Sequence, residues 1–247
     1  MENANLKNTI YDVDKLISLQ ENHILEIDGE QYSEKELTRI PKMAESEHPK
    51  NIGVHSLQAL CALMKTEIDA HVSPVFIEVV DCRNVRAFTT YRNDFKRDAI
   101  YDVTCDTPRF DWGHYLNHES AIIAIMSRFI QNSDTEYMLK LLSSITVGNA
   151  VTSNDNGVTQ QVEARSGVSL KQKVTVKPFV KIAPYRTFLE VEQPESTMLL
   201  RVNDDAEILL VEADGGMWQL EAKARIKTYL EEQLETLIAC EKVIVIA

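Results

Sequence analysis

Two histidines four residues apart are the closest approach to a metal site in this sequence. His114 and His118 would share one face of a helix, and imidazole nitrogens placed in this way can close on a zinc ion. That arrangement requires one helix through both residues. Gly113 precedes the first histidine, and Asn117 or Ser120 is a typical N-cap, so we predict that His114 lies in the preceding loop. Since no third ligand stands at a recognisable spacing, we predict no bound metal.

The turn Asp214-Gly215-Gly216 could hold an anion, because it joins an apolar strand to a helix. Backbone amides and the positive end of the dipole attract negative groups to a helix N-terminus. A structural role explains the same residues. The two glycines supply positive φ for a tight connection, and Asp214 complements the helix dipole. A lone Gly-Gly pair lacks the specificity of a complete phosphate-binding loop, so the structural role is favoured. Asp214, Gly215 and Gly216 remain the candidate anion-binding residues.

The stretch KIAPYRTFLEVEQPES, residues 181–196, places two prolines, a Tyr-Arg pair and three glutamates between segments typical of β-strands. Its central part, TFLEVE, predicts a further short strand. In a regular strand Arg186, Glu190 and Glu192 share one face and form a partly solvated charge cluster, which is a sufficient structural explanation. Together with Tyr185 these residues are also the candidate contact surface for a protein partner.

The sequence carries none of the local signatures of common catalytic or nucleotide-binding sites. GxSxG, GxxxxGK[ST], GxGxxG and DxDxDG are all absent. We therefore predict no catalytic residues and no cofactor, and we interpret the chain as an enzyme less readily than as a non-enzymatic protein. The four cysteines contain no CxxC pair and predict free thiols in a reducing cytoplasm: Cys61, Cys82, Cys105 and Cys240.

The formal net charge of −12 disfavours nucleic acids and anionic membranes as partners, unless the basic residues are segregated on one face. In a single unbroken strand four lysines of equal parity would share such a face: Lys171, Lys173, Lys177 and Lys181. The N-terminal residues are polar and acidic, and no apolar run approaches the about 20 residues that cross a bilayer. We expect a cytoplasmic protein with no membrane partner.

The first half of the chain predicts helices and an antiparallel sheet. Residues 1–53 form a polar arm with a short amphipathic segment around residues 33–40. Residues 54–146 form an α/β half. It begins with the helical pattern HSLQALCALMKTEIDA, for which Ser56 is the N-cap. The runs PVFIEVVD, VRAFTTYR and DAIYDVTC predict an antiparallel meander, and apolar periodicity predicts helices at residues 122–130 and 135–144.

The second half, residues 147–247, is rich in predicted strands. They fall in GVTQQVEARSG, KQKVTVKPFVKI, TFLEVE, TMLLRVN and EILLVEAD. A last helix is predicted over residues 217–237, and KVIVIA forms a terminal strand. The predicted fold class is α+β, with mostly antiparallel sheets, covering helices, and a β-rich second half that ends in a long helix and a strand. The two halves form separate domains or one continuous domain.

The segments PYRTFLEVEQPESTMLLRV and LLVEADGGMWQLEAKARIKTYLEEQL, within residues 177–247, resemble the YfdQ-like family of phage and prophage proteins. Before residue 150 a helix, a small sheet and a tryptophan-containing turn follow in the same order. The resemblance implies a phage protein that works in the bacterial host, often encoded near early recombination or replication genes. It implies no catalytic residue that could be transferred to this chain.

Two hypotheses of function follow. In the first, the chain is a cytoplasmic phage accessory protein without enzymatic activity that binds a phage or host protein or self-assembles into a homo-oligomer, or into a particle as a structural component. In the second, it is an enzyme or nucleotide-binding protein of phage DNA replication or recombination, with its site near His114, His118 and the turn 214–216. The terminal strand KVIVIA either completes its own sheet or pairs with another subunit.

Overall fold

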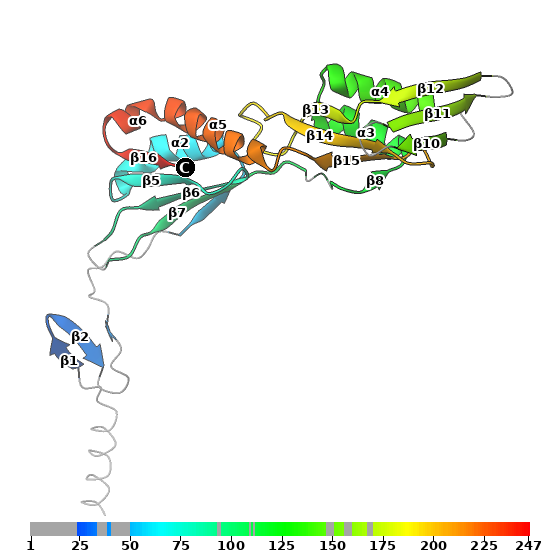
Figure 1. Cartoon of the computed structure of the whole chain (residues 1–247). Helices are drawn as coiled ribbons and strands as arrows, with labels where there is room; N and C mark the ends of the chain where they lie inside the picture. The colour runs from blue at the N-terminus through cyan, green and yellow to red at the C-terminus, as the bar shows by residue number, and fades with distance from the viewer. Residues whose placement is uncertain are drawn as a thin grey trace, which may run out of the picture. The chain divides into compact units, whose positions relative to one another are not determined.

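The computed structural model describes residues 24–33, 39–40, 50–92, 95–108, 110, 112–146, 151–155, 160–166 and 170–247 (Figure 1). The chain divides into two compact units, Met1–His48 and Pro49–Ala247. Helices and mostly antiparallel sheets make up the described residues, and the chain ends with a helix and a strand. The predicted α+β class is therefore confirmed.

The first unit contains an antiparallel sheet of β1 (Ile24–Ile27), β2 (Glu30–Ser33) and β3 (Arg39–Ile40). Asp28 and Gly29 join β1 to β2 with φ values of 54° and 78°. A two-residue loop with positive φ at both positions matches the twist of hairpin strands, which favours Asp-Gly. The amphipathic segment predicted at residues 33–40 begins and ends in strands, and its residues 34–38 lie outside the described part of the chain.

The first sheet of the second unit has the strand order β16-β5-β6-β7-β4. These strands are β4 (Ile52–Val54), β5 (Val75–Val79), β6 (Asn84–Thr89), β7 (Ala99–Thr104) and β16 (Val243–Ile246). The predicted meander is confirmed, because β5, β6 and β7 pair antiparallel in sequence order. At the two edges, β16 pairs parallel with β5 and β4 pairs parallel with β7.

One face of this sheet is covered by α2 (Leu57–Glu67), α5 (Met217–Gln233) and α6 (Glu235–Ala239) (Figure 1). The predicted cap of α2 is confirmed, since the Ala59 N–H donates to Ser56 Oγ at 3.1 Å. A short 3₁₀ turn, η1 (Ile68–Ala70), follows α2. The helix predicted over residues 217–237 is interrupted at Leu234, where φ is −112° and ψ is 16°, so that α5 ends and α6 begins.

The core below these helices follows from alternation in the strands. In β5 the inward residues Val75, Ile77 and Val79 are buried. They pack in one cluster with residues of α2 and α5: Leu57, Leu60, Cys61, Met64, Ile226 and Leu230. The opposite face of the sheet, called the outer face below, carries the intervening residues of each strand.

The second sheet has the strand order β8-β15-β14-β13-β9. Its strands are β8 (Tyr115–Leu116), β9 (Phe129–Ile130), β13 (Phe179–Pro184), β14 (Ser196–Val202) and β15 (Ile208–Glu212). Two helices, α3 (His118–Arg128) and α4 (Ser133–Thr146), share its core. The prediction of a helix through residue 130 was wrong at its end, because Phe129 and Ile130 pair with Pro184 and Ala183 as a strand. The helix predicted at residues 135–144 is confirmed by α4.

A third sheet is an antiparallel meander of β10 (Val151–Asp155), β11 (Gln160–Ser166) and β12 (Leu170–Val176). Strand β12 ends at Val176 and β13 begins at Phe179, with Pro178 between them. The unbroken strand that would put all four candidate lysines on one face is therefore absent. Lys177 instead places its Nζ 3.3 Å from Asp134 Oδ1 on α4.

The chain leaves the first sheet after β7, builds the other two sheets, and returns to the first sheet through α5, α6 and β16. Strands and helices from both sides of residue 147 therefore meet in one core. The segment 185–195 joins β13 to β14 of the second sheet, and its Phe188 and Val191 are buried in the core of the first sheet.

Candidate functional site

The segment 185–195, called the connector below, is not the strand that TFLEVE predicts. Gln193 organises it as a compact turn and is itself 4% exposed. Gln193 Oε1 accepts from the backbone N–H groups of Arg186 (3.0 Å) and Thr187 (3.2 Å), and Gln193 Nε2 donates to the carbonyls of Phe188 (2.9 Å) and Val191 (3.2 Å). The strand prediction failed because one buried amide supplies the partners that a neighbouring strand would have supplied.

The Arg186 guanidinium is buried at the base of the connector. It donates to Glu212 Oε1 at 2.9 Å, to the Pro194 carbonyl at 3.3 Å and to Ser196 Oγ. Its Cζ lies 3.7 Å from the centroid of the Trp218 ring. Burial lowers the pKa of Arg186 to about 10, although Glu212 and Asp214 act in the opposite direction. Arg186 therefore remains charged near neutral pH and is used within the fold.

The structure separates the other three predicted contact residues. Glu190 Oε1 accepts from the Gln58 N–H at the start of α2 at 3.3 Å. Glu192 is exposed and its carboxylate lies 3.3 Å from Arg225 of α5. Tyr185 is 37% exposed and lines an open hollow of about 420 Å³. The single charge cluster expected from strand alternation does not form, because the connector is a turn.

The turn Asp214-Gly215-Gly216 has the geometry expected for its structural role. Gly215 and Gly216 have φ values of 63° and 81°, which favour glycine, and Gly216 is the N-cap residue of α5. Asp214 Oδ1 accepts from the Gly216 N–H at 3.1 Å, and the Met217 N–H donates to the Asp214 carbonyl at 3.3 Å. Both amides are therefore engaged within the turn, and the Asp214 carboxylate supplies the negative charge at this helix start.

Two of the candidate residues, Arg186 and Asp214, are joined by Ser196, which the sequence did not indicate. Ser196 Oγ accepts from Arg186 and donates to Asp214 Oδ2. Asp214 and Ser196 line an open cleft of about 450 Å³, together with Lys181, Trp218 and Glu221 among others. The cluster ties β14, the connector and the start of α5 together, and its charges are largely matched within the fold.

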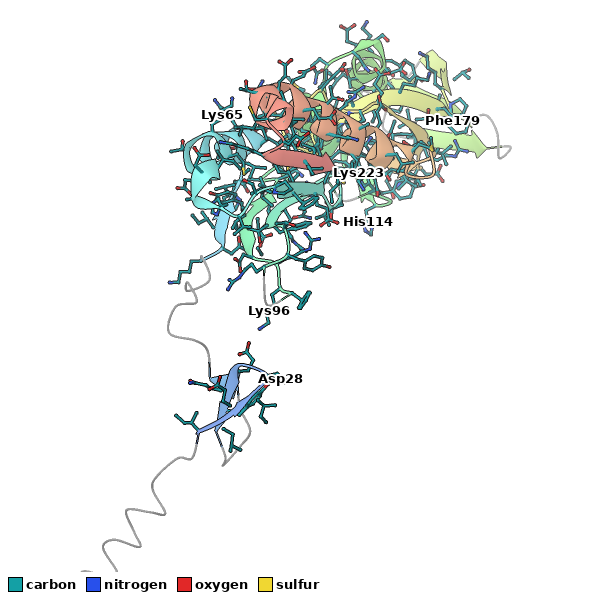
Figure 2. The ribbon with its side chains drawn as sticks, turned by 90° about the vertical axis from the view of Figure 1, so that its left-hand side faces the viewer. Asp28, Lys65, Lys96, His114, Phe179 and Lys223 are labelled. Atoms are coloured by element: carbon teal, nitrogen blue, oxygen red, sulfur yellow. The ribbon has the colours of Figure 1, made fainter. Side chains whose placement is uncertain are left out.

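The two histidines lie as predicted. His114 belongs to the loop before β8 (Figure 2), and His118 is the first residue of α3. Asn117 is the N-cap, since its Oδ1 accepts from the Ser120 N–H at 2.9 Å. The pair does not share a helical face. Over the described ranges of the chain, no group of three or more His, Cys, Asp or Glu side chains could hold a metal ion.

The outermost strand β16 is the feature with the clearest capacity for an intermolecular contact. The terminal strand lies in its own sheet, parallel to β5, and among the strands that the structure describes it has a neighbour on one side only. Val243 is buried on the helix side, whereas Ile244 and Ile246 on the outer face are 39% and 38% exposed. A groove of about 470 Å³ runs beside the strand and is lined by Pro74, Glu231, Ile238, Glu241 and residues 243–245.

The direction of the backbone groups of β16 follows from its first hydrogen bond. The Val75 N–H donates to the Lys242 carbonyl at 2.9 Å, so even-numbered residues turn their backbone groups toward β5. In a parallel ladder the N–H and C=O of one residue point to the same side, and the side alternates along the strand. Val243 and Val245 therefore direct their N–H and C=O groups to the open edge. KVIVIA indicated a strand, but only the strand order shows which groups remain available.

Comparisons of this chain with protein families, with curated proteins and with solved structures found no match. Within the part of the chain that the structure describes, no helix has the length and apolar character needed to span a membrane. The candidate site is therefore interpreted from its own geometry.

Proposed function

We propose that this chain is a non-enzymatic phage or prophage accessory protein that acts in the bacterial cytoplasm through association of its own copies. The observation that supports the proposal is the open edge of β16, where backbone donors and acceptors lie beside exposed isoleucines and a groove lined in part by Pro74 and Ile238. Unpaired strand edges associate with other strands unless they are covered, twisted or charged. The resemblance of residues 177–247 to the YfdQ-like family supports the phage origin.

The proposed contact is antiparallel pairing of β16 with β16 of a second copy about a twofold axis perpendicular to the sheet. Val245 is the natural centre, because its N–H and C=O both face the open edge and would pair with those of the partner's Val245. This register places Ile244 opposite the partner's Ile246. The exposed isoleucines would then cover one another on the outer face, and both helix layers would lie on the same side of the joined sheet.

Pairing of four-residue strands alone buries little area, and stable interfaces bury on the order of 1,200 Å² or more in total. The groove beside β16 adds contact area through Ile238 and Pro74. Glu231 and Glu241 also line this groove, and each copy carries a net charge of −12, so repulsion opposes association at low ionic strength. We expect association to strengthen as salt is added.

Val245→Pro tests this contact with the smallest disturbance of the fold. Proline removes the N–H that faces the open edge, while the groups of Ile244 and Ile246 that face β5 remain. Deleting the whole strand would be less informative, because Val243 is 1% exposed and belongs to the core. Val245→Ala is the matched control, since it shortens the same side chain and keeps the N–H donor.

The measurement is the molar mass by light scattering over a wide range of protein concentration, with thermal unfolding to check the fold. We expect wild type and Val245→Ala to form a discrete oligomer and Val245→Pro to be a monomer of unchanged fold. A wild-type protein that stays monomeric throughout the range, or a Val245→Pro variant of wild-type mass, would refute the proposed contact.

A further inference from the structure

Residues 83–97, which include β6 and the residues that follow it in the β6–β7 hairpin, carry a positive net charge. Residues 83–97 contain five cations, Arg83, Arg86, Arg92, Lys96 and Arg97, and one acid, Asp94. The whole chain carries a net charge of −12. The same fifteen residues contain the aromatic residues Phe88, Tyr91 and Phe95. Basic residues interleaved with aromatic residues are typical of nucleic-acid-binding surfaces.

The rings and one of the cations form an ordered cluster on the outer face. Phe76 of β5 and Phe88 of β6 are direct cross-strand partners, and their rings stack with centroids 5.7 Å apart and planes 17° apart. The Cζ of Arg97 lies 5.0 Å and 5.3 Å from these two centroids and 4.1 Å from that of Tyr91. Arg97 also donates to the Thr89 carbonyl at 3.1 Å. Its guanidinium is thus fixed in place at the surface before any ligand arrives.

The end of the hairpin presents a second aromatic side chain to solvent. The Arg92 N–H donates to the Lys96 carbonyl at 2.9 Å, and the Phe95 N–H donates to the Arg92 carbonyl at 3.0 Å. Phe95 has a φ of 58°, which is unusual for a residue with a side chain, and is 85% exposed. Tyr91 is 61% exposed. Two large exposed rings in so short a segment contribute little to the stability of the isolated fold, so this arrangement points to a ligand.

The carboxylates near the hairpin are used by other arginines. Asp98 lies 3.2 Å from Arg92, and the side chains of this pair are 8% and 16% exposed. Asp102 lies 3.4 Å from Arg86 on the outer face. Arg97 forms no ion pair with any carboxylate in the described residues. The Arg97 guanidinium is therefore held at the surface by aromatic rings and by the Thr89 carbonyl.

We propose that the outer face, from the Phe76–Phe88 pair to the hairpin end at Phe95, binds single-stranded nucleic acid. Unpaired bases can stack on Tyr91, Phe95 and the Arg97 guanidinium, because every base has a π-face. Arg97 and Lys96 lie at the same end of the hairpin, where phosphates of a bound strand would contact them. A duplex hides its base faces inside the stack, so this surface favours single strands. The net charge of −12 opposes such binding, and the positive charge of residues 83–97 is a local exception to it.

Fluorescence anisotropy with a fluorescein-labelled oligothymidylate of about 20 nucleotides tests the proposal on the full chain, at about 0.05 M and about 0.15 M salt. Tyr91→Ala and Phe95→Ala should each weaken binding about tenfold, because each removes one stacking platform. Lys96→Ala should lower the magnitude of the salt slope of log K by about 0.7, the value for one phosphate contact with a single strand. Thermal unfolding should be nearly unchanged in these variants, since the substituted side chains are exposed.

Lys65 provides the matched control for charge. It lies on α2, in the helix layer on the other side of the sheet from Lys96 (Figure 2). Lys96→Glu and Lys65→Glu change the net charge equally, so we expect the former to abolish binding and the latter to leave it within about twofold.

Four results would overturn the proposal. The first is no binding of the oligonucleotide by wild type at the lower salt concentration. The second is equal weakening by Lys65→Glu and Lys96→Glu, which would indicate a response to net charge alone. The third is duplex binding as tight as single-strand binding that does not depend on Tyr91 and Phe95. The fourth is Phe95-dependent binding to anionic phosphatidylserine vesicles without oligonucleotide binding, which would assign the hairpin to a membrane surface.

Discussion

Arg186 and Arg97 make the same kind of contact in opposite surroundings. The Cζ of Arg186 lies 3.7 Å from the Trp218 centroid, and that of Arg97 lies 4.1 Å from the Tyr91 centroid. Arg186 is 7% exposed and pairs with Glu212, whereas Arg97 is exposed on the outer face beside exposed rings. An arginine stacked over an aromatic ring therefore does not have the same role at every position. Burial and the nearest carboxylate decide whether it holds the fold together or remains available to a ligand.

The connector and the β6–β7 hairpin differ in the same way over their whole length. In the connector, Gln193 and Phe188 are buried, and the Gln193 amide donates to the Phe188 carbonyl. In the hairpin, Tyr91 and Phe95 are exposed, and backbone hydrogen bonds join Arg92 to Lys96 and Phe95 to Arg92. Substitutions in the connector should therefore affect stability, and substitutions in the hairpin should affect binding.

The largest expected difference is between two phenylalanines. Phe188→Ala removes a side chain that is 1% exposed, and we expect a loss of about 3–5 kcal/mol in the free energy of unfolding because a cavity remains in the core. Phe95→Ala removes a side chain that is 85% exposed and should change stability by less than about 0.5 kcal/mol. Urea unfolding of the two variants checks this, and equal losses would contradict the division between connector and hairpin.

The two arginines should show a smaller difference of the same sign. Arg186→Met leaves Glu212 without its cation and Ser196 without one donor, so we expect a loss of about 3 kcal/mol in the free energy of unfolding. Arg97→Ala removes an exposed cation and should cost less than about 1 kcal/mol. Both variants are compared with wild type by urea unfolding. If Arg97→Ala is the more destabilising variant, the outer-face cluster is a structural element like the connector.

The pH dependence of stability gives the smallest of these effects. Burial raises the pKa of the Cys61 thiol from 9.0 to about 11, with a smaller contribution in the same direction from Glu190 of the connector. The folded state then holds the proton more tightly than the unfolded state, so this contribution to stability is complete below pH 9 and is lost as the pH rises through 11. The shift corresponds to a loss of about 2 to 3 kcal/mol.

Substitution of two cysteines isolates that contribution. Cys61→Ala should reduce the decline in the free energy of unfolding between pH 9 and pH 11, and Cys240→Ala, at an exposed thiol, should leave it as in wild type. The measurement is urea unfolding at a series of pH values. An identical decline in all three proteins would show that other groups account for the pH dependence.

Local signals in the sequence were sufficient for most elements of the fold. Ser56 before a helical period predicted α2 and its cap, and β-branched runs with short charged turns predicted the meander β5-β6-β7. Asn117 as a cap predicted that His114 lies in a loop and His118 in α3. These features depend on residues only a few positions apart, and their physical cause lies in local hydrogen bonds and side-chain alternation.

The same local signals failed where a distant residue supplied the partner. TFLEVE has the alternation of a strand. The side-chain amide of Gln193, however, donates to the Phe188 carbonyl, and the Phe188 ring is buried in the core of the first sheet. Phe129 continues the period of α3, but Pro184 offers it a strand partner. Intrinsic preference is worth a few tenths of a kcal/mol per residue, and a buried hydrogen-bonded side chain outweighs it.

The sequence by itself determined the fold class, the caps and turns, and the concentration of cations and rings in residues 83–97, because each of these is a property of neighbouring residues. Only the tertiary structure decided that Arg186 is buried and Arg97 exposed, and that β16 forms an edge of its own sheet. Burial depends on which segments from elsewhere in the chain cover a side chain. The open edge of β16 depends likewise on which strands remain unpaired when the sheets are complete.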